Sequence, residues 1–185
     1  SFVQFFYVGT QALIPTGIFF RANGLKMYVL DGNTDSVFEY DLSTAWDIST
    51  ASYLQGLAAP TGAGNPSNPT GVFFKPDGLK MYWSDNGVPR IYQFDLTTAW
   101  DVTTGSYIFP PTTDYFSLAA QDTSPGASFF KPDGLKMYVV GNSGNSVDEY
   151  DLSTAWEIGT ASFVQLYDLT AQESQPRGLF FKPDG

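Results

Sequence analysis

Three repeated pairs of a tryptophan and an acid are the side chains of this sequence best suited to hold a ligand. Each pair follows a segment Asp-Leu-Ser/Thr-Thr-Ala. An indole face can stack on the apolar face of a pyranose ring while the carboxylate accepts hydrogen bonds from sugar hydroxyls, and one weak site per repeat gains affinity by avidity. The candidate ligand-binding residues are Trp46, Asp47, Trp100, Asp101, Trp156 and Glu157.

The same segments have a structural interpretation. An Asp near Ser or Thr can cap its own turn by accepting backbone N–H bonds, and the indole can fold back onto the edge of its repeat. A fourth tryptophan, Trp83, occurs in one repeat only and cannot belong to a repeated site. The sequence leaves both interpretations open.

Two missing residue types limit catalysis. The chain has no cysteine and no histidine, which excludes thiolate nucleophiles, Ser-His-Asp and Cys-His arrangements, and zinc-hydrolase sites. The sequence therefore predicts no catalytic residue, no metal ligand and no cofactor, and we expect a protein that is not an enzyme.

One run of acids resembles a metal loop. Residues 31–35 carry acidic or amide side chains at alternate positions, as at the start of a calcium loop. A helix-loop-helix calcium site would need glycine at position 36 and glutamate at position 42, where this chain has Ser36 and Leu42. We interpret the run as a hairpin turn rich in Asp, Asn and Gly.

The charge limits the partners. Nine basic residues stand against nineteen acidic ones, a net charge of −10, which repels phosphate backbones and anionic lipid surfaces. No apolar run approaches the roughly 20 residues that a membrane span needs. We expect no nucleic-acid partner and no membrane insertion. The localisation stays open, with an extracellular or virion-associated protein favoured.

A tandem repeat organises the chain. The units begin at Pro15, Pro69, Pro125 and Pro176. In the first three units a serine follows the proline at a distance of 37 residues, so the core of the unit has a fixed length and the variation lies in the connection to the next unit. A constant core with variable connections is typical of a repeat protein.

Each unit predicts four short strands. In the second unit these are 71–75, 80–83, 90–94 and a strand near 106–108. The first two are joined by Pro76-Asp77-Gly78, and an Asp-Gly turn suits a hairpin because both of its residues tolerate positive φ. Four antiparallel strands in tandem predict an all-β protein, a β-propeller built of four-stranded antiparallel blades, with about three and a half blades in this chain. We assign residues 1–185 to a single β-propeller domain or part of one, with repeats at approximately 15–68, 69–124 and 125–175 and partial blades at 1–14 and 176–185.

Two strands of each blade bear on function. The third strand alternates with period two, so its equivalent residues Glu39, Gln93 and Glu149 are predicted to form an outward-facing row in solvent. The first strand of a propeller blade lines the central channel, and here those strands contain no carboxylate.

The repeat also carries a resemblance to a known family. The segment Phe-Phe-Lys-Pro-Asp-Gly-Leu-Lys-Met-Tyr at 73–82 and 129–138 resembles the FSPDGxxLYV blade repeat of lactonase-like and YVTN-type propellers. The longer run from Tyr40 to Ser52 is similar to repeats of uncharacterised marine bacterial and phage propellers. The resemblance covers essentially the whole chain and implies the propeller fold. It also implies an alternative function, a metal-dependent lactonase or hydrolase, from which the inner strands depart because they lack metal-holding carboxylates.

These observations predict a non-enzymatic binding or adhesion module that recognises a glycan or a protein through repeated sites on its blades. A purely structural component of a virion or cell surface is a further alternative. In a six-bladed ring each blade turns the chain by about 60°, so three blades cover half a circle and leave two apolar faces open. We expect a second copy of the chain to close the ring, unless the natural chain supplies the remaining blades itself.

Overall fold

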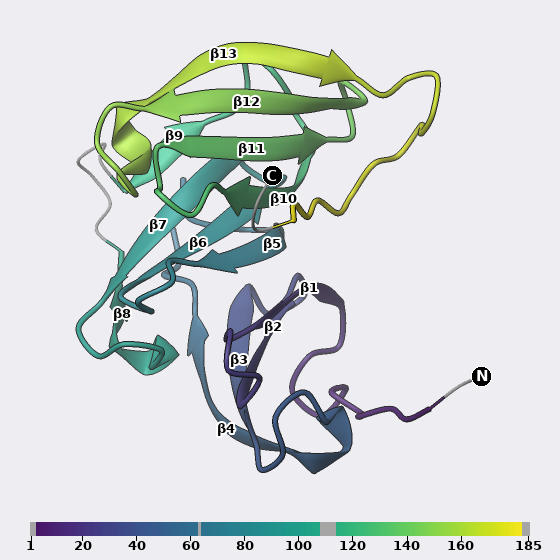
Figure 1. Ribbon diagram of the computed structural model, residues 1–185, viewed down its shortest axis with the longest axis vertical. Coiled ribbons are helices and arrows are strands. Elements are labelled where there is room, and N and C mark those ends of the chain that lie inside the picture. Colours follow the sequence, from purple (N-terminus) through teal and green to yellow (C-terminus); the bar gives the residue numbers. More distant parts are fainter. Residues whose placement is uncertain (1–2, 63, 108–113, 183–185) are drawn as a thin grey trace.

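Three antiparallel sheets follow one another along the molecule (Figure 1) in this computed structural model, which describes residues 3–62, 64–107 and 114–182. The first sheet contains β1 (Pro15–Phe20), β2 (Lys26–Asp31), β3 (Ser36–Leu42) and β4 (Ala51–Ala58). The second contains β5 (Pro69–Phe74), β6 (Lys80–Asp85), β7 (Arg90–Leu96), β8 (Gly105–Ser106) and β9 (Tyr115–Ser117). The third contains β10 (Pro125–Phe130), β11 (Lys136–Gly141), β12 (Ser146–Leu152) and β13 (Ala161–Asp168). We call them the first, second and third blade, and they confirm the predicted all-β class.

The second and third strands pair in the same register in every blade. The tyrosine of the second strand lies opposite the third-strand Glu or Gln, in the pairs Tyr28–Glu39, Tyr82–Gln93 and Tyr138–Glu149. Because successive strand residues face opposite sides, a slip of one residue would move every apolar side chain to the wrong face. The repeat therefore places the same residue types on the same face of each blade.

The turn between the first two strands differs from the prediction in one respect. Only its glycine has positive φ, at 72° in Gly24, 76° in Gly78 and 73° in Gly134. In the second blade Pro76 occupies the first turn position and its ring holds φ near −65°, so a turn with two left-handed residues cannot form. Gly78 N–H closes the turn on the carbonyl of Lys75 at 2.8 Å.

The fourth strand varies between blades. The first and third blades have a continuous outer strand of eight residues, β4 and β13. In the second blade the outer position is shared by β8 and β9, which both pair with β7. The strand predicted at 106–108 corresponds to β8, and its last residue lies outside the described part of the chain.

The segment between the third and fourth strands of each blade, which we call the connector, contains the tryptophan. A short 3₁₀ helix follows this tryptophan in each blade. These helices are η1 (Ile48–Thr50), η2 (Val102–Thr104) and η3 (Ile158–Thr160). Val102 and Ile158 are fully buried, because each points into the contact between its own blade and the preceding one.

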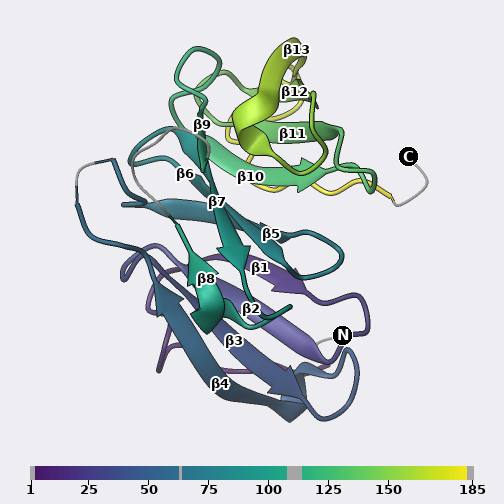
Figure 2. The same ribbon diagram turned by 90° about the vertical axis from the view of Figure 1, so that its left-hand side faces the viewer.

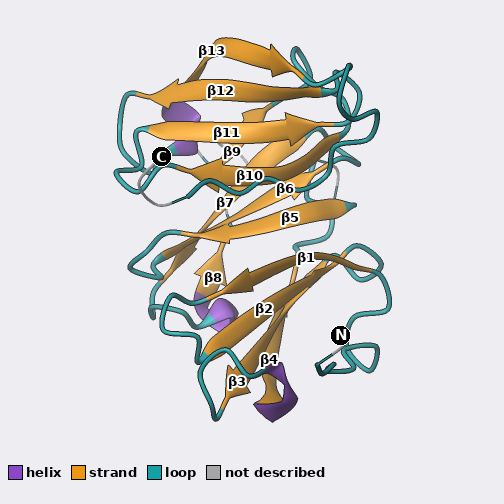
Figure 3. Ribbon diagram, turned by 45° about the vertical axis from the view of Figure 1, so that its right-hand side comes forward, coloured by secondary structure: helices purple, strands orange, loops and turns teal. Residues whose placement is uncertain are grey.

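Most of the core lies between blades, and a smaller apolar cluster lies between the first blade and the N-terminal segment. One apolar cluster joins the first blade to the second and another joins the second to the third, and we call these contacts the two joints. The inner strands β1, β5 and β10 lie side by side (Figures 2 and 3), and residues of all three strands line one cavity. Within the described residues, no helix is long and apolar enough to cross a membrane.

Candidate binding surfaces

The connector tryptophans adopt a strained backbone for a structural reason. Their φ angles lie in the left-handed region, and each backbone N–H donates to the carbonyl of the turn glycine in the same blade. Such a conformation costs a bulky residue about 1–3 kcal/mol. The indole offsets the cost by packing on that glycine, where any Cβ would overlap the ring. The φ angles and N–H to carbonyl distances are 65° and 2.9 Å for Trp46 on Gly24, 68° and 2.9 Å for Trp100 on Gly78, and 67° and 3.0 Å for Trp156 on Gly134.

Two of the three tryptophans are buried in the joints. Trp100 is 7% exposed and Trp156 8%, whereas Trp46 is 59% exposed. The indole of Trp100 stacks on Phe74 with ring centroids 5.6 Å apart, and its carbonyl accepts a hydrogen bond of 2.9 Å from the Tyr28 hydroxyl of the preceding blade. The predicted aromatic platform is not exposed on every blade: the preceding blade covers the indole in the second and third blades, and among the tryptophans of the described chain only Trp46 is exposed.

The acids beside the tryptophans have structural partners. Asp47 and Asp101 each cap the following 3₁₀ helix by accepting its second backbone N–H at 3.0 Å. Asp101 also accepts from Gln55 of the first blade at 2.8 Å, and Glu157 accepts from Gln93 of the second blade at 3.0 Å. Two of the three acids thus carry polar contacts across a joint, in agreement with the structural interpretation.

Within the part of the chain that the structure describes, no preceding blade lies beside Asp47. The side-chain hydroxyl and the backbone N–H of Ser49 lower the pKa of Asp47, and a hydrogen bond from Gln4 lowers it further. Gln4 belongs to the N-terminal segment, and it contacts Asp47 in the way that Gln55 contacts Asp101. The ligand-binding role of the six residues stays a prediction, and Trp46 with Asp47 is the pair that remains accessible.

The third-strand row does not face solvent. Glu39 is 1% exposed and Gln93 2%, because the next blade covers both. Glu39 forms an ion pair with Lys26 and accepts a 3.3 Å hydrogen bond from the backbone N–H of Val102 across the first joint. The prediction of an outward-facing solvent row is wrong at these two positions. At Glu149 no further blade lies beside the row in residues 3–62, 64–107 and 114–182.

The acidic run that resembled a calcium loop is a turn held by one buried carboxylate. Asp31 accepts hydrogen bonds from the backbone N–H groups of Ile14, at 2.6 Å, and Thr34, at 2.9 Å. Asp85 does the same in the second blade. In the third blade the carboxylate comes from the connection instead, since Asp122 fills the space beside Gly141. Among the described residues no group of three or more acids is placed to hold a metal ion.

The inner side of the blades has few side chains that could take part in acid–base chemistry. A cavity of about 600 Å³ lies along β1, β5 and β10 and is lined by glycine, threonine, serine, aliphatic and aromatic residues. Among the described residues that line it, Arg177 is the one charged residue and none is a carboxylate. Such a wall offers apolar contacts and hydroxyl groups but no acid–base pair.

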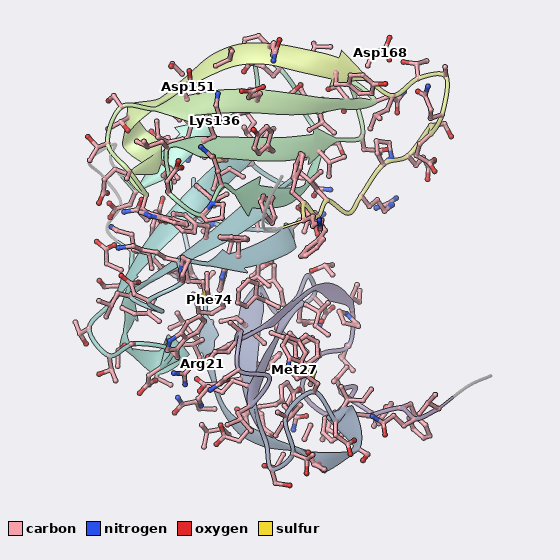
Figure 4. The ribbon with its side chains drawn as sticks, viewed as in Figure 1. Arg21, Met27, Phe74, Lys136, Asp151 and Asp168 are labelled. Atoms are coloured by element: carbon pink, nitrogen blue, oxygen red, sulfur yellow. The ribbon has the colours of Figure 1, made fainter. Side chains whose placement is uncertain are left out.

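The two end blades each have one face with no further blade beside it in the described chain. On the first blade the N-terminal segment packs on that face through Phe6, Val8 and Ala12. The first blade has a cavity of about 360 Å³ lined by residues that include Phe6, Ile18, Met27, Val29 and Ile48. The third blade has another of about 360 Å³, lined by Tyr138, Val147, Glu149, Gln165, Leu166, Tyr167 and Phe181. Figure 4 shows that the first and third blades lie at opposite ends of the molecule: Met27 is labelled in the first blade, and Lys136 and Asp151 lie on neighbouring strands of the third.

The comparisons with known proteins identify the fold. The sequence matches no protein-family model and no curated protein. The structure is similar to a candidate 6-phosphogluconolactonase of Bacteroides fragilis, with TM-score 0.59 and 16% identity over 83% of this chain and 39% of that one. A second candidate 6-phosphogluconolactonase, from Bacteroides uniformis, gives 0.61 and 15% over 92% and 45%. The periplasmic gluconolactonase of Pseudomonas aeruginosa gives 0.59 and 19% over 92% and 45%.

At these identities the likeness shows the fold alone. The chain is a partial β-propeller, similar in structure to lactonase-like propellers, and it spans less than half the length of the solved structures it matches.

Proposed function

We propose that this protein is a non-enzymatic binding module whose arc of blades is completed into a ring by a second copy of the chain. The observation that carries the first part is the wall of the cavity along β1, β5 and β10, since its described residues include no acid or base that could transfer a proton. The second part is supported by length: this chain covers 45% of the Bacteroides uniformis structure, so two arcs would cover about nine-tenths of such a propeller.

Light scattering on the purified chain tests the second copy. We expect a species with twice the chain mass of 20.3 kDa at micromolar concentration, because each open apolar face gains by being covered. A 20.3 kDa species that persists up to about 100 µM would overturn the second-copy proposal, since stable interfaces associate well below that concentration.

Recognition of a glycan or another protein is the remaining part of the proposal. The indole of Trp46 and the carboxylate of Asp47 are accessible in the single chain and support it, because they combine an apolar stacking face with a hydrogen-bond acceptor. Ring closure would cover this pair as it covers Trp100, so we expect the site to bind only below the dimerisation concentration. Binding to a glycan array by the wild type, and its loss in Trp46→Ala, would support this site. Binding that is unchanged in Trp46→Ala would exclude it.

A second candidate function is lactone hydrolysis. The observation in its favour is the structural likeness to the candidate 6-phosphogluconolactonases and the gluconolactonase. An assay of gluconolactone and 6-phosphogluconolactone opening, with and without added divalent metal, separates the two candidates. Turnover above the spontaneous rate would overturn the non-enzymatic proposal, and we expect none.

A further inference from the structure

The two joints within the chain use the same hydrogen bond. In the first, the Tyr28 hydroxyl donates to the backbone carbonyl of Trp100 at 2.9 Å. In the second, the Tyr82 hydroxyl donates to the carbonyl of Trp156 at 2.8 Å. In both cases the donor lies on the second strand of one blade and the acceptor in the connector of the next.

The joints also share a polar contact at their outer side. Across the first joint, Gln55 donates to Asp101 and the backbone N–H of Val102 donates to Glu39. Across the second, Gln93 performs both tasks, since its amide donates to Glu157 and accepts from the N–H of Ile158 at 3.2 Å. The two contacts together define which face of a blade meets which face of its neighbour.

The third blade repeats the donor side of a joint with no blade beyond it. Its open cavity is lined by Tyr138, Glu149 and Gln165, which are equivalent to Tyr28, Glu39 and Gln55 of the first blade. The side chain of Glu149 is 18% exposed, whereas that of Glu39 is 1% exposed. No blade covers this surface in the described chain.

The first blade repeats the acceptor side. Trp46, Asp47 and Ile48 are equivalent to Trp100, Asp101 and Val102 of the second blade. Ile18, which is 60% exposed, corresponds to Val72, which is 8% exposed in the first joint. The open faces of the two end blades are thus the two halves of one further joint.

We propose that the open face of the third blade docks on the open face of the first blade of a second copy, head to tail. The Tyr138 hydroxyl then donates to the Trp46 carbonyl, Gln165 donates to Asp47, and the N–H of Ile48 donates to Glu149. This inference rests on the proposed second copy and specifies its interface. Two such joints, one at each end of the arc, close a ring in which every face is used.

The segments on either side of the three blades each lie where a strand of a neighbouring blade would lie. The N-terminal segment lies on the first blade as a preceding fourth strand would, with Phe6 edge-on to Tyr40 at 5.6 Å. The same contact joins Phe116 to Tyr150 in the second joint, at 5.3 Å. At the other end Phe181 packs on Tyr138 at 4.6 Å, as Phe74 packs on Tyr28 at 4.3 Å.

These end segments must leave for a second copy to dock. Phe6 occupies the place that Tyr167 of the incoming third blade would take, and Phe181 the place of Phe20 of the incoming first blade. The docked strands belong to hydrogen-bonded sheets and the end segments are single, so the incoming strands are held by more contacts. The end segments therefore act as removable covers of the two faces.

A pair of complementary variants tests the docking. Val147→Arg places a charge on the open third-blade face, and Ile18→Arg places one on the open first-blade face. We expect each variant alone to be monomeric, with dimer affinity reduced on the order of 100-fold or more, because a buried unpaired charge is costly. An equimolar mixture retains one intact joint and should form a heterodimer. Leu135→Arg is the control, because Leu135 and its equivalent Leu79 are both exposed although Leu79 belongs to a covered blade.

The outcomes separate the two proposals. If the wild type dimerises and neither arginine variant changes its affinity, the interface is elsewhere and this inference is overturned while the second copy stands. If Val147→Arg alone is monomeric and Ile18→Arg still dimerises, the interface is face to face between third blades. If the wild type never dimerises, the proposed second copy fails and the docking with it.

Two milder changes examine the contacts themselves. Tyr138→Phe should weaken each joint about fivefold, or about 1 kcal/mol, through loss of one hydrogen bond, whereas Tyr28→Phe should leave the dimer affinity unchanged. Phe6→Ala should strengthen dimerisation because it weakens the cover on the first blade. Weaker dimerisation in Phe6→Ala would show that the end segment itself makes the contact, which contradicts its displacement.

Discussion

Trp100 and Trp46 occupy the same place in their repeats but end in different environments. Their φ angles are 68° and 65°, and both donate a 2.9 Å hydrogen bond to the turn glycine. Yet Trp100 is buried in a joint and Trp46 is mostly exposed. The local conformation is therefore fixed within a blade, while burial is set by whether another blade lies beside it.

The largest expected effect separates these two tryptophans. Trp100→Ala should cost about 3–5 kcal/mol of unfolding free energy, because it leaves a cavity against Phe74 and removes packing on Tyr28. Trp46→Ala removes a mostly exposed ring and should cost less than about 1.5 kcal/mol. Urea unfolding below the dimerisation concentration measures both. Equal costs would mean that the first blade face is already covered in solution.

A second pair of variants should show no such difference. Asp31 and Asp85 are both fully buried and both accept backbone N–H groups within their own blade and its connection. Replacing either by Ala leaves buried donors unpaired and should cost about 2–3 kcal/mol in each case. Urea unfolding should therefore give matched losses, and a much smaller loss for Asp31→Ala would show that the first blade depends on a neighbour even for its local turns.

A smaller effect on the unfolding free energy is expected for two equivalent tyrosines, one in a closed joint and one on the uncovered face of the third blade. Tyr82→Phe removes the hydrogen bond to the Trp156 carbonyl in a closed joint and should cost about 1 kcal/mol. Tyr138→Phe should change the unfolding free energy of the monomer by only a few tenths of that amount, because no blade lies beyond the Tyr138 hydroxyl within the described chain. A comparable cost in both variants would indicate an acceptor for Tyr138 in the monomer.

Much of the fold can be predicted from the sequence because the same turn and strand residues recur in every repeat. The unit-opening prolines Pro15, Pro69 and Pro125 are the first residues of β1, β5 and β10. The turn glycine and the alternating third strand likewise follow from residue types that recur at fixed spacing. The four-stranded antiparallel blade could be predicted because each blade is specified by local turns and alternation.

The environment of the candidate site was harder to predict from the sequence. Period-two alternation correctly gave two faces to the third strand, but it could not tell that the face with Glu39 and Gln93 meets another blade instead of water. A polar residue in a strand usually faces solvent, and here it is buried because the partner acid and N–H arrive from a connector about 60 residues away. One signal in the sequence could have indicated contacts between blades: the second-strand Tyr and the connector Trp recur together in every unit.

The smallest expected effect is a gain in stability, whereas the variants above lose stability. It concerns Asp148 in the second joint. Asp148 stands where the first and second blades have Phe38 and Tyr92, and it is 1% exposed with one carboxylate oxygen lacking a hydrogen-bond partner. Burial raises the pKa of Asp148, the Ser146 hydroxyl opposes that change, and the charge of Asp122 adds to it. A carboxyl group whose folded pKa is raised destabilises the fold when it is ionised.

Asp148→Asn should therefore stabilise the protein at pH 7, with a slightly higher melting temperature. The gain should shrink as the pH falls through the raised folded pKa of Asp148, because the folded wild type then takes up its proton before the unfolded chain does. Below the ordinary aspartate pKa of about 3.9 both states are protonated and the pH-dependent gain disappears. Melting curves of both proteins from pH 7 to pH 4 measure it. A destabilised variant at pH 7 would show that the ionised carboxylate is compensated in the second joint, which would make the two closed joints equivalent.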